Sequence, residues 1–420
     1  MTYAEAVRFL YSLGNEVKAA KLGLDRVDAL LAALGAPHRR GEYIHVAGTN
    51  GKGSVCAMIE AALRASGVRT GLYTSPHLIE PAERIRISGE PLSEQAFAAA
   101  FDEVHAAAER LIASGALEAH PTYFETVTAM AFLAFRDAGV QTAVLEVGLG
   151  GRLDATNVVT PRLAIITPVD FDHEAFLGRS LEAIAGEKAG ILKPGARAVF
   201  SAQRPEVERT LADAASALGV EPVWTSRWPI SGLALYPGGS CFQVGGIRVD
   251  CPLAGEHQVA NAATAAVALH TLGLGPAAIR DGIRQARWPG RLERVASAPE
   301  IILDGAHNPA GARALAAYIN RFFDGRRVWL VYGAMRDKAV EEMGAILFPL
   351  ADEIVATAPR QARSVRPETI RELADHPRLR TAGTLEDALA LVRREAAPED
   401  AVFVSGSLFL AGEARRLLCR

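Results

Sequence analysis

The sequence contains few cysteines and no motif that would pair them. Its 420 residues include four, Cys56, Cys241, Cys251 and Cys419, which form no CxxC pair and have no spacing typical of a metal site. Scattered cysteines of this kind are typical of reduced thiols in a cytosolic protein. We therefore expect a cytoplasmic location.

The sequence also lacks long hydrophobic runs and an excess of charge of one sign. No uninterrupted apolar stretch reaches the roughly 18 residues that suggest a transmembrane helix. The start, MTYAEAVRFLYSLG, lacks the basic and apolar regions of a secretory signal. The net charge is −3, and 22% of the residues are charged, so the protein has no overall basic field. We expect neither a membrane nor a nucleic acid as partner, and a polyanionic substrate would have to meet local positive charge.

The sequence does contain a repeated alternation of short apolar runs, turns with Gly, Pro or Asp, and longer helical patterns. The alternation covers residues 43–63, 142–148, 163–192, 300–319, 327–347 and 401–418. It is typical of α/β units whose parallel strands are buried on both faces. Ligand sites in open sheets of this kind lie beyond the carboxyl ends of the strands, where these turns fall.

Two segments interrupt this alternation. Residues 222–252 consist of short β-like pieces separated by Gly and Pro, which predicts a small antiparallel β insert. The segment RWPGRLERVASAPE is rich in Pro, Gly and charge, which predicts a linker. We therefore expect one α/β domain over residues 1–290, carrying the insert, and a second over residues 296–420.

A glycine-rich turn in YIHVAGTNGKGSV is the first candidate site. The strict P-loop pattern GxxxxGK[ST] does not fit, because Val46 stands where the first glycine should be. Gly53 also separates Lys52 from Ser54. The turn nevertheless follows a strand pattern and precedes a helix pattern, where backbone N–H groups and a helix N-terminus can bind an anion. This context favours a phosphate site over a turn whose lysine is merely solvated.

Polar side chains at the ends of several apolar runs form a second candidate site. Glu146 ends one run, Ser75 follows another in YTSPHL, and His173 lies in DFDHEAFLG. A carboxylate at the end of a buried strand is costly unless a charged partner or a metal meets it. A single histidine is more often an ordinary core or surface residue, so the shared strand-end position carries the hypothesis. The three residues together predict Mg²⁺ bound beside ATP phosphates.

Lys188 stands out through its helical spacing. In SLEAIAGEKAGIL it shares one helix face with Leu181 and Ile184. A lysine on such an apolar stripe either extends its ammonium group to water or is buried for a chemical reason. Burial lowers the pKa of a lysine, and a neutral amine can react with carbon dioxide to form an anionic carbamate. That reaction would convert a cation into a metal ligand.

Taken together, the motifs of this sequence resemble those of one family. HVAGTNGKGS, YTSPHL, TYFE, VLEVGLGGRLDATN, DFDHEAFLG, EKAGILKPG, NAATA, PGRLE and DGAHNPAG occur in this order. The set resembles the folylpolyglutamate synthase/dihydrofolate synthase family, a branch of the ATP-dependent Mur ligase superfamily, over nearly the whole chain. The resemblance implies an N-terminal P-loop ATPase domain, a C-terminal Rossmann-like domain and an active site in the cleft between them.

The resemblance also implies roles for individual residues, with Lys52, Lys188 and His173 as the catalytic groups. ATP would be bound by Asn50, Gly51, Lys52, Gly53, Ser54, Asn261, Arg291, Asp304 and His307. Mg²⁺, as two ions, would be bound by Ser75, Glu146, His173 and carbamylated Lys188. The pterin-linked substrate would be bound by the loop before residue 22 and by Thr122, Tyr123, Phe124, Glu125, Arg152, Leu153, Asp154 and Ala155.

Two features depart from the family pattern. Asp170 and Phe171 precede the Asp–His pair, where the family has a small or aliphatic stretch. The extra carboxylate either tunes metal affinity or faces solvent. The loop NEVKAAKLGL has fewer polar residues than the corresponding loop of the bifunctional members. It leaves the choice of acid substrate open and does not touch the ATP chemistry.

The resemblance implies that ATP activates a carboxylate as an acyl phosphate, which the amine of L-glutamate then attacks. The acids would be dihydropteroate and the γ-carboxylate of reduced folates, the products would include ADP and phosphate, and we expect a monomeric enzyme. Three alternatives stay open. They are folylpolyglutamate synthase activity alone, another Mur-type amino-acid ligase, and an ATP-binding regulatory protein that ligates nothing.

Two observations weigh against the last two alternatives. A UDP-muramoyl ligase carries a further domain of about 100 residues before its phosphate loop, whereas only 47 residues precede Gly48 here. A protein that only senses ATP needs none of Lys188, Asp304 and His307.

Overall fold

The structure, a computed structural model, describes residues 1–14, 23–374 and 376–419. The chain forms two compact units, which we describe separately. The first comprises Met1–Gly232, Phe242–Asp250 and Ala260–Ala286, and the second comprises Leu233–Cys241, Cys251–Val259 and Arg287–Arg420. The loop before residue 22, an expected substrate contact, lies outside the described residues.

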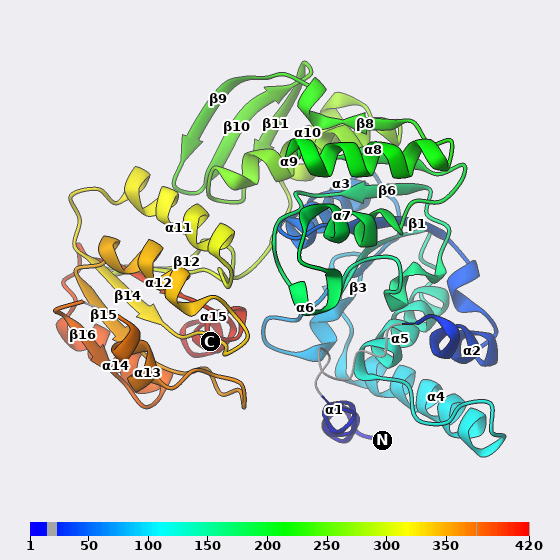
Figure 1. Cartoon of the computed structure of the whole chain (residues 1–420), viewed down its shortest axis with the longest axis horizontal. Helices are drawn as coiled ribbons and strands as arrows, with labels where there is room; N and C mark the ends of the chain where they lie inside the picture. The colour runs from blue at the N-terminus through cyan, green and yellow to red at the C-terminus, as the bar shows by residue number, and fades with distance from the viewer. Residues whose placement is uncertain (15–22, 375, 420) are drawn as a thin grey trace. The chain divides into compact units, whose positions relative to one another are not determined.

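The first unit is built on an eight-stranded sheet of order β4-β3-β2-β5-β1-β6-β7-β8 (Figure 1). Its strands are β1 (Glu42–Ala47), β2 (Thr70–Tyr73), β3 (Ile85–Ile87), β4 (Glu90–Pro91), β5 (Thr142–Glu146), β6 (Leu163–Ile166), β7 (Arg197–Phe200) and β8 (Pro222–Trp224). Neighbours from β2 to β8 are parallel, and β3 and β4 extend one edge antiparallel. The central strand β1 is buried from Tyr43 onward, which explains its continuous apolar sequence.

Two separate apolar cores hold helices to this sheet. Side chains of α1, α2, α4 and α5 pack with Ala143 of β5, and side chains of α7 and α8 pack with Ala164 of β6. The helices of this part of the chain are α1 (Tyr3–Ser12), α2 (Asp25–Ala33), α3 (Lys52–Ala65), α4 (Glu94–Ala113), α5 (Tyr123–Asp137), α6 (Glu174–Leu177), α7 (Leu181–Ala189), α8 (Pro205–Ala217), α9 (His257–Thr271) and α10 (Pro276–Ile283).

A small three-stranded sheet lies where the β insert was expected. It has the order β11-β10-β9 and consists of β9 (Ile230–Tyr236), β10 (Gly239–Val244) and β11 (Ile247–Cys251). Residues 222–224, at the start of the expected insert, instead form the last strand of the large sheet. The reason is packing, because the Trp224 ring lies edge-on to the Phe200 ring of β7 with centroids 4.9 Å apart.

The second unit is built on a six-stranded sheet of order β12-β13-β17-β14-β15-β16 (Figure 1). Its strands are β12 (Glu293–Ser297), β13 (Glu300–Leu303), β14 (Val328–Tyr332), β15 (Glu353–Ala356), β16 (Leu379–Thr381) and β17 (Ala401–Ser405), and its helices are α11 (Pro309–Phe322), α12 (Val340–Leu347), α13 (Pro367–Leu373), α14 (Leu385–Glu395) and α15 (Leu408–Leu418). Only β12 is antiparallel to its neighbour among the pairs described. The expected α/β fold with largely parallel sheets is confirmed.

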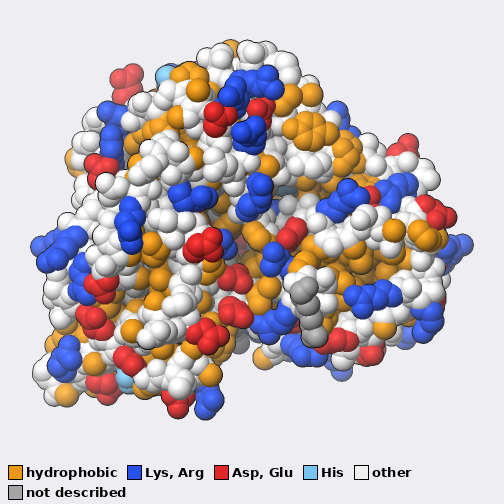
Figure 2. Space-filling model, turned by 180° about the vertical axis from the view of Figure 1, so that it is seen from behind, with side chains coloured by type: hydrophobic (Ala, Val, Ile, Leu, Met, Phe, Trp, Pro, Cys, Tyr) orange, Lys and Arg blue, Asp and Glu red, His pale blue; other side chains and the backbone are white. Residues whose placement is uncertain are grey.

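The surface and the thiols agree with the composition. All four cysteines are free thiols. Among the described residues, no helix combines the length and the apolar character needed to cross a bilayer. Basic and acidic side chains are interspersed on the face shown in Figure 2, as expected for a chain with little net charge.

Candidate active site

The glycine-rich turn joins the carboxyl end of β1 to helix α3. Gly51 is the N-cap of α3 and has a φ of 86°, and Lys52 begins the helix. A Cβ atom on Gly48 would collide with the side chain of Thr167, and one on Gly51 would collide with the side chain of Asn261. Glycine is therefore required at both positions by close approach as well as by backbone conformation. The turn packs against the segment after β6 and against helix α9, which brings Asn261 to it as expected.

Two lysine side chains share one acceptor in this turn. Lys52 Nζ donates to the carbonyl oxygens of Gly48 and Thr49, both at 3.1 Å. Lys188 Nζ donates to the same Gly48 oxygen at 2.9 Å. Lys188 is only 4% exposed, so its ammonium group does not extend to water. Of the two outcomes that its spacing allowed, the structure shows burial.

Burial has a large effect on the protonation of Lys188. Desolvation, followed by the charge of Lys52, lowers the pKa of Lys188 to about 7, although Asp172 and Asp154 oppose the shift. A lysine in water has a pKa near 10.4 and is almost fully charged at neutral pH. Lys188 therefore carries a substantial fraction of neutral, nucleophilic amine at neutral pH.

The backbone of Lys188 is fixed by the loop that follows β5. The N–H of Arg152 donates to the Glu187 carbonyl at 2.8 Å, and the Arg152 guanidinium group donates to Glu187 Oε1 at 2.8 Å. Gly151 lies directly against helix α7, since a Cβ atom there would press on the backbone of Glu187 and Lys188. Arg152, an expected substrate contact, is thus an exposed ion-pair partner of Glu187 in this structure.

Glu146 and Ser75 meet as the sequence predicted. Glu146 ends β5, is 5% exposed, and accepts the backbone N–H of Ser75 on Oε2 at 3.1 Å. Val46 of β1 pairs with Glu146 of β5, so this carboxylate lies beside the end of β1, where the chain enters the glycine-rich turn. A buried carboxylate beside a serine offers the oxygen ligands that Mg²⁺ prefers, so these residues fit the expected metal.

His173 lies in a segment that is tied to the glycine-rich turn. Thr49 Oγ1 donates to the carbonyl oxygen of Asp170 at 2.9 Å and accepts the N–H of Asp170 at 3.0 Å. His173 is the N-cap of α6 in the left-handed conformation, with a φ of 52°, and its Nε2 lies 3.9 Å from Asp172 Oδ1. The negative charge of Asp172 lies close enough to Lys188 to raise the pKa of that lysine.

The extra carboxylate, Asp170, contacts both a backbone N–H group and a charged side chain. Its Oδ1 accepts the backbone N–H of Phe171 at 2.9 Å and lies 3.5 Å from Arg204 Nη2. It therefore forms an ion pair with Arg204, the N-cap residue of helix α8, which is a contact that neither of the two alternatives from the sequence included.

Asp154 organises the loop in which the sequence placed substrate contacts. Its Oδ2 accepts the N–H groups of Gly148 and Leu149 at 3.0 and 2.9 Å, and its Oδ1 accepts the N–H and hydroxyl of Thr156 at 3.0 and 2.5 Å. Thr156 in turn contacts His45 Nε2 at 2.7 Å. Complete burial raises the pKa of Asp154, while these hydrogen bonds oppose the rise. Leu153 and Ala155 flank this carboxylate.

The TYFE segment begins helix α5 with a reciprocal cap. Thr122 Oγ1 accepts the N–H of Glu125, and Glu125 Oε2 accepts the N–H of Thr122 at 2.8 Å. Arg26 of helix α2 donates to both oxygens of Glu125, with Nη2 3.0 Å from Oε1. The Phe124 ring fills the space that a Cβ atom on Gly148 would need. The segment is thus held next to the loop after β5.

A row of contacting side chains, among them Tyr11, which the sequence did not assign to the site, leads to Tyr123. The Arg84 guanidinium group lies over the Tyr123 ring, 5.0 Å from its centroid, and Arg84 Nε donates to His77 Nδ1 at 2.9 Å. His77 Nε2 contacts Tyr11 OH at 3.3 Å, and Tyr11 stacks on Tyr123 with centroids 5.8 Å apart. Burial and Arg84 lower the pKa of His77, which keeps it neutral. His77 belongs to the YTSPHL motif, whereas Tyr11 gave no signal in the sequence.

In the second unit, Asp304 follows β13 and holds two turns. Its oxygens accept the N–H groups of Leu292 and Ala306 at 3.0 and 2.9 Å. Burial raises the pKa of Asp304, and the nearby charge of Arg291 opposes the rise. His307 Nδ1 donates to the Gly305 carbonyl at 2.8 Å, which leaves Nε2 as an acceptor. The structure brings Arg291 and Asp304 together as expected.

Comparison with known protein families gives two matches. The family model described as Mur ligase middle domain matches residues 46–269, and the one described as Mur ligase, glutamate ligase domain matches residues 290–408. The two matches cover the glycine-rich turn and the Asp304 turn respectively.

Individual proteins resemble the chain over almost its full length. A dihydrofolate synthase/folylpolyglutamate synthase from Mycobacterium tuberculosis is 39% identical, and the match covers 94% of this chain and 90% of that protein. The structure of M. tuberculosis folylpolyglutamate synthase complexed with ADP and AMPPCP has a TM-score of 0.90 at 36% identity, covering 99% of both chains. E. coli FolC in complex with DHPP and ADP has a TM-score of 0.88 at 32% identity, covering 100% of this chain and 98% of the other.

Proposed function

The chain belongs to the dihydrofolate synthase/folylpolyglutamate synthase family of Mur ligases, and we propose that the region around Gly48 carries its ATP-dependent step. The protein is an ATP-dependent folate glutamate ligase, and we propose that it adds L-glutamate to dihydropteroate and to the γ-carboxylate of reduced folates through an acyl phosphate. A free carboxylate is a poor electrophile, so the reaction requires this activation. Most of the catalysis of such a phosphoryl transfer comes from positioning and charge stabilisation.

The glycine-rich turn supplies positive charge for the phosphates of ATP. Helix α3 begins at Lys52, so its N-terminal dipole and the Lys52 ammonium group act from the same end. Asn50, Gly51, Gly53 and Ser54 complete the proposed phosphate site, with Asn261 beside Gly51. Each donor aimed at charge that develops in the transition state is worth roughly 3–4 kcal/mol.

Carbamylation of Lys188 is the modification that its environment favours. The single observation that carries this proposal is a buried amine, hydrogen-bonded to Gly48, whose pKa lies at about 7. The neutral amine attacks carbon dioxide, an N–C bond forms, and one proton leaves to solvent. The resulting anion would be attracted by Lys52, whereas the ammonium form is repelled by it.

Ser75, Glu146, His173 and the carbamate of Lys188 would hold two Mg²⁺ ions. Bound Mg²⁺ supplies Lewis-acid stabilisation of phosphoryl oxygens. The chain itself positions Glu146 against the Ser75 amide and ties the His173 segment to Thr49. His173, Lys188 and Lys52 are the proposed catalytic residues.

Two further groups of residues would bind the remaining parts of the substrates. Thr122, Tyr123, Phe124 and Glu125, with Leu153, Asp154 and Ala155, shape the surface around the loop after β5, where a pterin-linked acid would bind. Arg152 would have to leave Glu187 to meet an anionic substrate group. In the second unit, Arg291, Asp304 and His307 would bind the base and sugar of ATP.

We further propose that residues 1–290 and 296–420 work as the ATP-binding and ligase domains of a cytoplasmic monomer. The free thiols support a reducing compartment. Sedimentation of the purified protein tests the monomer, and a dimer at assay concentration would contradict it.

One assay tests the function. Purified protein is incubated with ATP, Mg²⁺ and L-glutamate, with dihydropteroate or tetrahydrofolate offered separately, and products are resolved by mass. ADP release that requires glutamate, with a glutamylated product from each acid, is expected. A product from tetrahydrofolate alone would restrict the activity to folylpolyglutamate synthase. ADP release indifferent to glutamate would overturn the ligase proposal in favour of an ATP sensor.

A further inference from the structure

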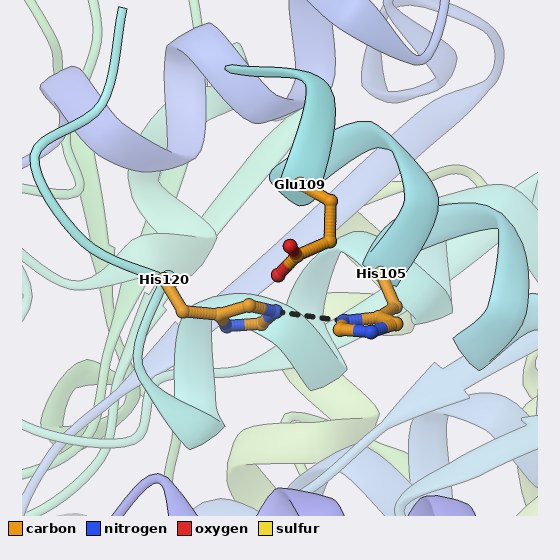
Figure 3. Close-up of side chains that lie close together, drawn as sticks. All are labelled: His105, Glu109 and His120. Atoms are coloured by element: carbon orange, nitrogen blue, oxygen red, sulfur yellow. Dashed lines mark hydrogen bonds between the residues drawn. The ribbon is translucent and has the colours of Figure 1, made fainter. Parts of the chain in front are cut away.

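Two histidines and a glutamate meet at a place that the ligase reaction does not use. His105, Glu109 and His120 each offer a ligand atom, and these atoms all lie within 4.8 Å of one another (Figure 3). They form the only group of three or more His, Cys, Asp or Glu side chains with this geometry among the residues that the structure describes. We call them the histidine cluster.

The cluster joins a helix to a loop. His105 and Glu109 are four residues apart on α4, so they lie on the same face of that helix, one turn apart. His120 lies in the loop that leads from α4 to α5, two residues before the Thr122 cap. In Figure 3 the Glu109 carboxylate points toward the gap between the two imidazole rings. Three donors from two elements thus converge on one point.

Hydrogen bonds define which nitrogen of His120 can bind a metal. Its Nδ1 lies 2.8 Å from the Pro121 carbonyl oxygen, which can only accept, so Nδ1 carries the proton. The lone pair is then on Nε2, which lies 3.2 Å from His105 Nδ1. A backbone carbonyl that fixes the tautomer in this way is the usual outer partner of a metal-bound histidine.

The spacing of the two facing nitrogens matches that of two ligands on zinc. Zinc binds imidazole nitrogen at about 2.0–2.1 Å in tetrahedral geometry, which separates two such nitrogens by about 3.3 Å. The observed separation is 3.2 Å. In the metal-free form the His105 Nδ1 proton occupies this gap. On metal binding, that proton would move through solvent to Nε2 of the same ring, which leaves the Nδ1 lone pair for the metal.

Packing holds both rings in place. His105 stacks on Phe101 with an interplanar angle of 11°, and Phe9 contacts the rings of His105 and His120 with centroids 4.5 and 5.2 Å away. The hydrogen bond to the Pro121 carbonyl and the contact with Phe9 hold the His120 ring with Nε2 facing His105. The rotamers are thus pre-set, which reduces the entropy lost on binding.

We propose that the histidine cluster binds one Zn²⁺ ion through His105 Nδ1, His120 Nε2 and a Glu109 carboxylate oxygen, with water as the fourth ligand. Imidazole and carboxylate donors suit zinc, and the histidine cluster shares no residue with the Mg²⁺ site proposed at Glu146. The ion would fasten helix α4 to the loop that begins α5. An ordinary histidine pair within an aromatic cluster is the competing interpretation.

Zinc stoichiometry and thermal stability test the proposal. Wild-type protein is treated with chelator, dialysed against micromolar Zn²⁺ in the presence of excess Mg²⁺, and assayed for bound zinc. His105→Gln, which keeps the bulk of the side chain, is expected to hold one equivalent less zinc than wild type. His270→Gln, a histidine of α9 outside the cluster, serves as the matched control and should hold as much as wild type.

A second variant keeps the test independent of folding. Glu109 is exposed, so Glu109→Gln leaves the packing intact. The variant should bind zinc at least about tenfold more weakly, because loss of even an outer partner of a metal ligand typically lowers metal affinity by this factor. Zinc should raise the melting temperature of wild type and of His270→Gln, and not that of His105→Gln. Equal zinc content in wild type and His105→Gln, or an equal melting shift in all four proteins, would overturn the proposal and leave the histidine pair as packing.

Discussion

The turn around Gly48 in the first unit and the turn around Asp304 in the second both bury a charged side chain beside a parallel sheet. Asp304 accepts two backbone N–H groups and feels the charge of Arg291. Lys188 donates to the Gly48 carbonyl, and a second cation, Lys52, uses the same oxygen. The partners nearest the buried carboxylate thus favour its charged form, whereas the buried ammonium group meets a second cation, which two aspartates only partly offset.

This difference distinguishes a buried charge that stabilises a turn from a buried amine that is made reactive. Desolvation is the largest cause of the pKa shift at both sites. At Asp304 the neighbouring donors oppose the shift, as they do at Asp154, but at Lys188 the nearest cation adds to it. A second cation beside a buried lysine does not stabilise a turn. It does favour the neutral form of the lysine, which is the reactive form.

Removing the amine should give the largest effect. Lys188→Ala is expected to lower kcat at least about 10³-fold, since it deletes both the carbamate and the charge it provides. Short carboxylic acids should restore part of the activity by occupying the vacated position. Steady-state rates with and without acetate or propionate measure this. Lys193→Ala, a half-buried lysine five residues further on, is the matched control and should stay within a few-fold of wild type. Full activity of Lys188→Ala would contradict the carbamate.

Changing the carboxylate beside Ser75 should have the next largest effect. Glu146→Gln is expected to lower turnover by about 10²-fold and to raise the Mg²⁺ concentration needed for half-maximal rate, because a metal ligand loses its charge. Glu60→Gln is the matched control. Glu60 is equally buried but bonds to Thr70 and Arg64, so its variant should lose stability and keep its Mg²⁺ dependence. An unchanged Mg²⁺ titration for Glu146→Gln would remove Glu146 from the metal site.

The two aspartates should respond through stability. Asp304→Asn and Asp154→Asn each lose the negative charge that accepts several backbone donors, and each should lower the free energy of unfolding by roughly 2 kcal/mol. Denaturant titration of both variants against wild type measures the loss. A variant as stable as wild type would show that the negative charge at that position does not contribute to the stability of the fold.

The smallest predicted effect is a change in how the free energy of unfolding depends on pH, and it arises from His257 in the second unit. Burial, followed by the charge of Arg291, lowers the pKa of His257 to about 4 from the usual value near 6.5. Between these values the unfolded chain binds a proton that the folded chain does not, so stability falls as the pH falls through this window.

His257→Asn removes this titration. The stability advantage of wild type over His257→Asn should therefore narrow by about 1.4 kcal/mol between pH 7.5 and pH 5.5, as measured by denaturant titration at both values. A constant difference between the two proteins across this range would show that His257 titrates normally.

The amino-acid sequence was sufficient to predict the fold class and some of the contacts within the candidate site. Short apolar runs bounded by turn residues, such as the one ending at Glu146, are typical of strands buried on both faces, and parallel strands bring their carboxyl ends to one edge. That rule was sufficient to bring Glu146 to Ser75, whereas Asn261, which lies on helix α9, was expected at the glycine-rich turn only from the family resemblance. Helical spacing also placed Lys188 on an apolar face.

The tertiary structure alone decided what the charged side chains do. Spacing allowed Lys188 to be buried or solvated, and only the packing of α7 against the loop after β5 directs it to Gly48. The same holds for Asp170, which pairs with Arg204 at the N-terminus of helix α8, and for the row from Tyr11 to Arg84. These contacts join residues far apart in the chain, and desolvation depends on every neighbour at once. Local patterns carry information about periodicity and turns but none about which distant groups share a buried volume.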